Sequence, residues 1–219
     1  MTQTQSNTKK LTLMAMLAAM AYVAMLITRP LPSVAGFLSY DLKDVVVVIA
    51  GFMLGAGPAM LITLVVSLLE MVTVSATGPI GLLMNVLSTC AFVLPATLIY
   101  HKNRRLRSAA IGLTLGTLLM TVVMLAWNYI ITPLYMNVPR SVVAGMLIPT
   151  FLPFNLFKGA LNAGITMLVY KPLASALRRA GLLSSSGSGA SPRTFNLTVT
   201  LVSLFVVVTS IIVFILMTR

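Results

Sequence analysis

Residues 45–74, VVVVIAGFMLGAGPAMLITLVVSLLEMVTV, form a long apolar run that Gly55-Ala56-Gly57-Pro58 interrupts. A membrane-spanning helix needs about 20 apolar residues, so this run is too long for one simple span. Glycine supplies turn geometry, and proline starts a helix well. The run therefore predicts a hairpin of two short membrane helices, at 42–56 and 58–75.

Apolar runs separated by helix breakers continue along the whole chain. Hydrophobic residues make up 58% and charged residues 8% of its 219 residues, unlike a soluble domain. We therefore predict an all-α membrane protein, a six-helix bundle with a seventh, C-terminal transmembrane helix. The first run, about 18 residues long, can span a membrane, so we interpret it as a retained helix rather than a signal peptide. The predicted helices cover 11–28, 42–56, 58–75, 80–100, 108–132, 151–171 and 195–217.

The sequence LLSSSGSGASPR, residues 182–193, interrupts this pattern near the C-terminus. A stretch of this Ser/Gly-rich composition cannot bury a core and is typical of a flexible tether. We therefore divide the chain into a six-helix substrate-binding membrane domain (1–180), a linker (181–194) and an extra helix (195–219). Two other segments, 29–44 and 132–149, are predicted to be long loops on the outer side.

The basic residues indicate how the helices cross the membrane. Fifteen lysines and arginines against three acidic residues give a net charge of +12. They lie in short clusters between apolar runs, not on one solvated face, which argues against a nucleic-acid partner. By the positive-inside rule we expect a multi-pass protein of the cell membrane, surrounded by lipid, with a cytoplasmic N-terminus. That orientation puts ten of the fifteen inside: Lys9, Lys10, Lys102, Arg104, Arg105, Arg107, Lys171, Arg178, Arg179 and Arg193.

The segment FNLFKGALNAG, residues 154–164, carries polar residues within an apolar helix. Asn155, Lys158 and Asn162 are spaced i, i+3, i+7 and share one helix face. A lysine at mid-bilayer costs about 2.5–3.5 kcal/mol, and snorkelling would explain the lysine but not the asparagines. Asn128 lies at a similar depth on the preceding helix, so we expect Asn128, Asn155 and Lys158 to converge near the outer leaflet. We interpret Asn162, which lies deeper, as a packing residue.

Three further features have more than one interpretation. Glu70 lies on a polar stripe that faces the bundle, where it pairs with Lys158 or Arg29 or is protonated. Gly81, in the segment TGPIGLLMN that ends at Asn85, permits either a tight turn or a close approach to a ligand. Ala15 and Ala19 form a small-xxx-small pair that suits close helix packing, within the chain or with a partner.

The residue inventory argues against enzymatic chemistry. His101 is the single histidine and lies in a basic cluster, and Cys90 is the single cysteine. An intramembrane serine protease needs an activated nucleophile and a base, and a metalloprotease needs a histidine and carboxylate set. No Gly-x-x-x-x-Gly-Lys-[Ser/Thr] loop for ATP is present. We therefore predict no catalytic residues, no metal site and no cofactor.

Taken together, the Ala15-xxx-Ala19 pair and the segments GFLSYDLKDV, GAGP, GPIGLLMN and PFNLFKG resemble the substrate-binding S component of energy-coupling factor (ECF) vitamin transporters. The resemblance is strongest to the riboflavin-specific members and covers about residues 10–175. It implies a six-helix bundle with an outer riboflavin pocket that the first loop gates. It also implies that Ala15 and Ala19 meet a transmembrane T subunit, which two ATPases drive. The implied riboflavin contacts are Leu38, Tyr40, Gly81, Asn85, Asn128, Asn155 and Lys158.

The seventh helix departs from that six-helix plan. Alternatives to riboflavin uptake are an S component for another vitamin, an ion-coupled transporter and an intramembrane hydrolase. The sequence lacks the inverted repeats and the paired membrane carboxylates expected of an ion-coupled transporter.

Overall fold

The computed structural model describes residues 3–34, 38–75, 77–179 and 197–218. This part of the chain is helical and has no β-strand, only an isolated bridge between Val34 and Leu38. Its helices are α1 (Gln3–Thr28), α2 (Lys43–Leu54), α3 (Ala56–Thr73), α4 (Gly78–Asn103), α5 (Leu106–Met136), α6 (Arg140–Met146), a π-helical turn (Leu147–Phe151), α7 (Leu152–Arg179) and α8 (Leu197–Thr218). The predicted all-α class is therefore confirmed.

The predicted hairpin is formed by α2 and α3. Gly55 joins the two helices at φ 98° and ψ 174°, a conformation essentially limited to glycine, and its N–H donates to the Gly51 carbonyl. Both halves of the apolar run contribute to the core. Val47 and Val48 are buried on α2, and Ile62 and Val66 are buried on α3. The turn residue thus divides one apolar run into two packed elements.

The segment 132–149 corrects the sequence interpretation, because most of it is helical and not a loop. Helix α5 continues through Pro133 to Met136 and ends at Asn137, which has a left-handed φ of 54°. Pro139 then immediately precedes α6, which leads through the π-helical turn into α7. The segment is proline-rich, and a proline is also well suited to the start of a helix.

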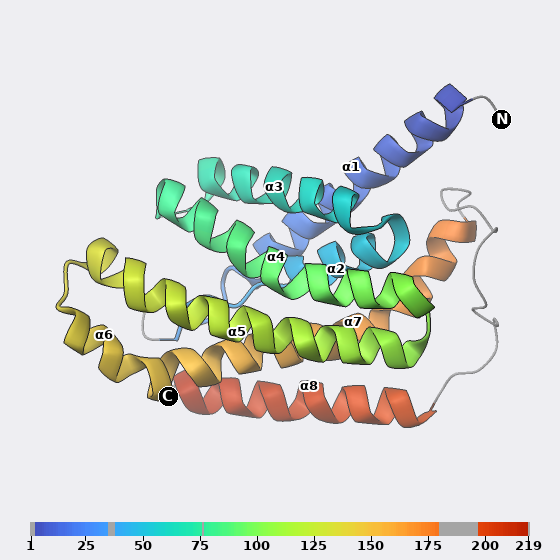
Figure 1. Ribbon diagram of the computed structural model, residues 1–219. Coiled ribbons are helices and arrows are strands. Elements are labelled where there is room, and N and C mark those ends of the chain that lie inside the picture. The colour runs from blue at the N-terminus through green and yellow to red at the C-terminus, as the bar shows by residue number, and fades with distance from the viewer. Residues whose placement is uncertain (1–2, 35–37, 76, 180–196, 219) are drawn as a thin grey trace.

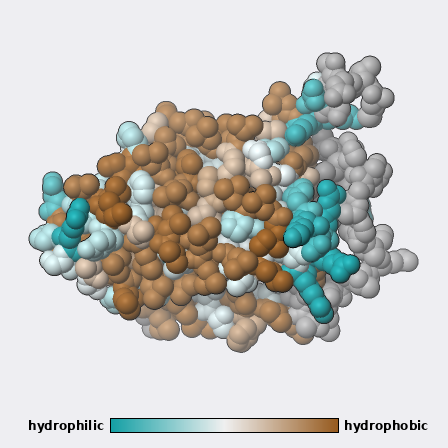
Figure 2. Space-filling view, in the orientation of Figure 1, coloured by the Kyte–Doolittle hydropathy of each residue, from teal (hydrophilic) through white to brown (hydrophobic). Residues whose placement is uncertain are grey.

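The outside of the bundle has the polarity of a membrane protein. Figure 2 shows an apolar band over the middle of the molecule, with hydrophilic residues at both ends. Five helical segments of the described chain are long and apolar enough to cross a membrane, the last running through α6 and α7. The exposed basic residues Lys102, Arg104, Arg105 and Arg107 lie at the α4–α5 turn, at one end of the bundle.

The predicted seventh helix is α8, which packs against α7 and runs beside it in Figure 1. The main apolar core lies among α1 to α5 and the C-terminal half of α7, whereas a second cluster joins the first loop to α6, the N-terminal half of α7 and α8. The predicted linker at 181–194 lies outside the described residues, so the division into domains stays a prediction.

Candidate functional site

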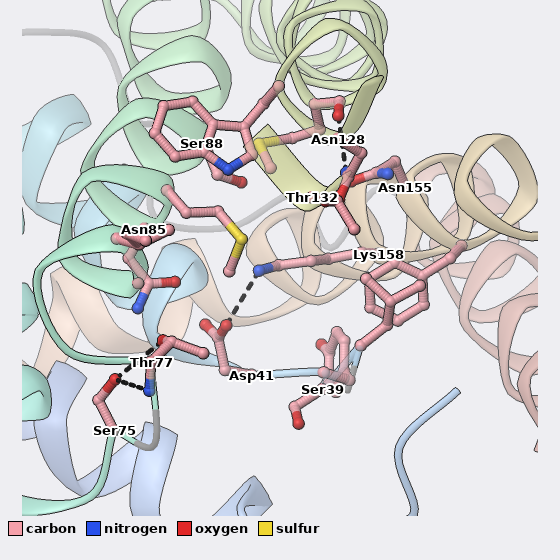
Figure 3. Close-up of a pocket in the computed structure, with 18 of the residues that line it drawn as sticks. Ser39, Asp41, Ser75, Thr77, Asn85, Ser88, Asn128, Thr132, Asn155 and Lys158 are labelled. Atoms are coloured by element: carbon pink, nitrogen blue, oxygen red, sulfur yellow. Dashed lines mark hydrogen bonds and ion pairs between the residues drawn. The ribbon is translucent and has the colours of Figure 1, made fainter. Parts of the chain in front are cut away.

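A cavity of about 290 Å³ opens at the end of the bundle opposite the α4–α5 turn. Figure 3 shows residues that line it. Its walls come from the last turns of α1 and α5, the first turns of α4 and α7, the α3–α4 connection and residues 38–41 of the first loop (29–42). Small-molecule sites commonly have volumes of roughly 300–1,000 Å³ and combine apolar walls with a few polar groups. This cavity therefore has the size and position of a small-ligand site.

The seven implied riboflavin contacts all line this cavity, and we call them the predicted contact set. Its members are Leu38, Tyr40, Gly81, Asn85, Asn128, Asn155 and Lys158. They come from four separate parts of the chain, which the bundle brings to one place. Their role as ligand contacts stays a prediction.

The three asparagines differ in how far the protein already uses their amides. Asn128 donates to the Met124 carbonyl at 2.7 Å and accepts from the Thr132 hydroxyl at 2.8 Å. The Asn155 Nδ2 donates to the Phe151 carbonyl at 2.8 Å. Within the described chain, neither the Asn155 Oδ1 nor the Asn85 amide has a side-chain partner. Asn85 and Asn155 therefore keep hydrogen-bonding capacity for a ligand.

All three acidic residues of the chain gather around two lysines beside the cavity. Lys158 Nζ lies 2.9 Å from Asp41 Oδ2 and 3.7 Å from Asp44 Oδ2. Lys43 Nζ lies 2.6 Å from Glu70 Oε2 and 3.9 Å from Asp41 Oδ2. The buried charges are thus largely compensated within one network, as buried ions require.

This network corrects the predicted partner of Glu70. The carboxylate pairs with Lys43 of α2 rather than with Lys158 or Arg29. Arg29 instead donates to the Val74 carbonyl at the rim of the cavity. The sequence interpretation counted Lys43 as an outer loop residue, but the start of α2 turns it inward, where its side chain is only 2% exposed.

A second layer of polar contacts lies beneath the cavity. Asn162, which is fully buried, accepts from the Tyr40 hydroxyl at 2.8 Å and donates to Asp44 Oδ2 at 3.5 Å. Asp44 also accepts from Thr89 of α4 at 2.6 Å. Asn162 does not line the cavity, but its hydrogen bonds orient Tyr40 of the first loop and Asp44 of α2. It was interpreted as a packing residue, and it also contributes these specific bonds.

Burial and neighbouring charges keep Tyr40 and Asp41 of the first loop in fixed protonation states. Burial raises the pKa of Tyr40, and Asp41 and Asp44 raise it further, so its hydroxyl stays neutral and donates to Asn162. Burial alone would raise the pKa of Asp41, but Lys158 and Lys43 outweigh it and hold that pKa below its ordinary value. Asp41 is therefore an anion at neutral pH and keeps its pairing with Lys158.

Aromatic and sulfur-containing side chains supply much of the apolar part of the cavity wall. Trp127 and Tyr135 of α5, Phe154 of α7, and Met25 and Met84 contribute this surface. The sequence did not identify Asp41 as a lining residue. No periodic signal marks Asp41, because the first loop has no helical repeat.

Two predictions concern groups away from the cavity. Ala15 and Ala19 lie on an exposed face of α1 and do not line the cavity. Among the described residues, no cluster of histidine, cysteine and carboxylate side chains could hold a metal ion. Partner contacts at Ala15 and Ala19 stay a prediction.

Comparison with known proteins identifies the family. Residues 9–170 match the family described as "ECF transporter, substrate-specific component". The chain is 32% identical to "Riboflavin transporter RibU" of Staphylococcus aureus (strain TCH60), over 78% of this chain and 93% of the relative. It is 28% identical to "Riboflavin transporter FmnP" of Bacillus subtilis (strain 168), over 74% and 90%.

A solved structure described as "Structure and mechanism of the S component of a bacterial ECF transporter" has a TM-score of 0.66 and 33% identity. That match covers 79% of this chain and 99% of the other. The chain therefore belongs to the family of ECF transporter substrate-specific components, and the predicted resemblance is confirmed. It is a multi-pass membrane protein and a transporter component, not an enzyme.

Proposed function

We propose that this substrate-specific component binds riboflavin in the cavity and serves riboflavin uptake as a subunit of an ECF transporter. The observation that carries the proposal is the convergence of the whole predicted contact set on one cavity. The relatives support the same ligand, because those from Staphylococcus aureus and Bacillus subtilis are both named riboflavin transporters.

The chemistry of the cavity suits an isoalloxazine ring. The ring has broad apolar faces, which Trp127, Phe154 and Met84 match, and one edge of carbonyl and imide groups. The free amide of Asn85, the Asn155 Oδ1 and the Lys158 ammonium supply donors and acceptors for that edge. Asp41 Oδ1 is buried without a hydrogen-bond partner in the described chain, so it offers a further acceptor for an imide N–H or a ribityl hydroxyl.

In this proposal the cavity faces the outside of the cell. The basic cluster at the α4–α5 turn marks the cytoplasmic end by the positive-inside rule, and the cavity lies at the opposite end. Residues 38–41 of the first loop cover the cavity, so movement of this loop would admit and release the vitamin. Riboflavin is then a transported ligand, not a cofactor.

Transport itself requires other subunits. The chain has no ATP-binding loop, so two ATPases would supply the energy through a T subunit. The exposed Ala15 and Ala19 face of α1 has small side chains that would let a T-subunit helix approach closely.

Binding to the purified full-length protein tests the proposed ligand. Trp127 is the only tryptophan and lines the cavity, so bound riboflavin should quench its fluorescence at a stoichiometry near one. Trp127→Phe should lose this signal yet retain binding by calorimetry. If calorimetry detects no riboflavin binding but detects another vitamin, the protein is an S component for that vitamin and the riboflavin assignment is wrong.

A further inference from the structure

The second apolar cluster connects the peripheral helix α8 with the cavity. It joins Val34, Leu38 and Tyr40 of the first loop to Phe154 and Phe157 of α7 and to Phe214 of α8. Leu38, Tyr40 and Phe154 also line the cavity. Helix α8 thus contributes one large side chain to the packing directly behind the candidate site.

The aromatic rings of this cluster form a continuous series from α8 to the cavity. The ring of Phe214 stacks on that of Phe157, with centroids 5.0 Å apart and planes 13° apart. Phe157 in turn contacts the cavity-lining rings of Tyr40, at 5.6 Å, and Phe154, at 6.4 Å. Phe157 does not itself line the cavity, so it transmits the position of Phe214 to two residues that do.

Close packing between α7 and α8 fixes the position of Phe214. A Cβ added at Gly164 of α7 would lie 2.9 Å from Val207 Cγ2 and 3.3 Å from the Ser203 carbonyl, so glycine permits the approach. Phe157 precedes Gly164 by seven residues, and Phe214 follows Val207 by seven, about 10 Å along each helix. Because the helices run in opposite directions, contact at Gly164 sets the register that brings Phe214 onto Phe157 (Figure 1).

The buried face of α8 agrees with this register. Ser203, Ser210 and Phe214 are the buried residues described on this helix, and their spacing places them on one face. Phe214 is 8% exposed, whereas Phe205 on the same helix is 68% exposed. The family match ends at residue 170, before α8 begins, so family membership assigns this helix no role.

We propose that Phe214 is a positioning residue for the ligand site. The Phe214 ring holds the Phe157 ring in place. Phe157 in turn holds Tyr40, and with it the segment 38–41, against the cavity. Helix α8 thereby slows release of the bound ligand. The ligand-release part of this inference rests on the proposed binding of riboflavin, whereas the effect on the first loop does not.

The test compares four variants of the full-length protein in detergent. Phe214→Ala should raise the riboflavin dissociation rate about two- to tenfold, the range expected for loss of one aromatic pair. Phe214→Tyr keeps the ring and should restore a rate near that of the unsubstituted protein, and Phe214→Leu should lie between the two. Phe205→Ala removes an exposed ring from the same helix and should change nothing.

Hydrogen exchange of the ligand-free protein gives a second, independent measurement. Amides of residues 38–41 should exchange faster in Phe214→Ala, while α2 and α4 keep their protection. Unchanged exchange at 38–41, or a uniform rise in every helix, would show that Phe214 has no specific link to the first loop. If the unsubstituted protein fails to bind riboflavin, the proposed function is wrong, and exchange at 38–41 still decides the role of Phe214.

Discussion

Lys158 illustrates how a charged residue is accommodated next to a membrane. Its ammonium is buried, which would be costly without compensation, and Asp41 and Asp44 provide that compensation at 2.9 and 3.7 Å. The sequence placed Lys158 on one face with Asn155 at the correct end of the helix. It did not give the carboxylate partners, because they precede Lys158 by more than 100 residues.

This arrangement predicts that Lys158→Met is strongly destabilising. Removing one partner of a buried ion pair costs about 3–5 kcal/mol, because a carboxylate is left uncompensated. The double variant Lys158→Met with Asp41→Asn should recover part of this loss, as measured by thermal unfolding in detergent. A double variant no more stable than Lys158→Met would contradict the assigned pairing.

Substitution of Asn155 tests ligand recognition, as substitution of Lys158 tests stability. Asn155→Ala removes an acceptor that the protein leaves open, and an unpaired ligand donor costs about 1–3 kcal/mol. We therefore expect riboflavin affinity, measured by calorimetry, to fall about 5- to 100-fold. Asn103→Ala alters an exposed asparagine at the far end of α4 and serves as the control. If the two variants bind riboflavin with equal affinity, Asn155 does not contact the ligand.

At the scale of elements, the α2–α3 turn depends on a single backbone conformation. Gly55 has φ 98° and nothing within 4 Å of an added Cβ, so a substitution there is strained without being crowded. Gly57 also has open space but no positive φ. The sequence pattern gave this hairpin with end positions within two residues of those observed.

We predict that Gly55→Ala lowers the free energy of unfolding by about 1–3 kcal/mol, the cost of a non-glycine residue in this region. Gly57→Ala should have little effect. Reversible unfolding in mixed micelles measures both variants. If the two variants have similar free energies of unfolding, the turn at residue 55 does not require the positive φ of a glycine.

The helical segment 140–151 shows where element prediction from sequence was wrong. Prolines at 139 and 149 suggested a loop, but proline breaks a helix only where its missing N–H and fixed φ conflict with the hydrogen-bond pattern. Pro139 precedes the first turn of α6, where neither conflict arises, and Pro149 lies in a π-helical turn.

For the molecule as a whole, the asymmetry of basic residues predicts an orientation in the membrane. The α4–α5 turn is strongly basic, whereas the exposed basic residues described at the end that holds the cavity are Arg29 and Arg140. This distribution predicts that the α4–α5 turn is cytoplasmic and that the cavity opens outward.

Labelling of single cysteines in intact cells tests that orientation. In a Cys90→Ala background, Arg140→Cys at the start of α6 should react with a membrane-impermeant maleimide. Asn103→Cys should react only after the membrane is permeabilised. The reverse pattern would place the cavity on the cytoplasmic side and contradict capture from outside.

The membrane class, the order of the long helices, the charge asymmetry and the polar face of α7 could all be inferred from the sequence, because composition and helical periodicity are local properties. It also carried the motifs from which the contact set was inferred. Three features are visible only once the helices are packed: Glu70 pairs with Lys43, Asn162 bonds to Tyr40 and Asp44, and Phe214 lies behind the site. These contacts join residues far apart in the chain, so they depend on how the helices pack, and no local pattern encodes that packing.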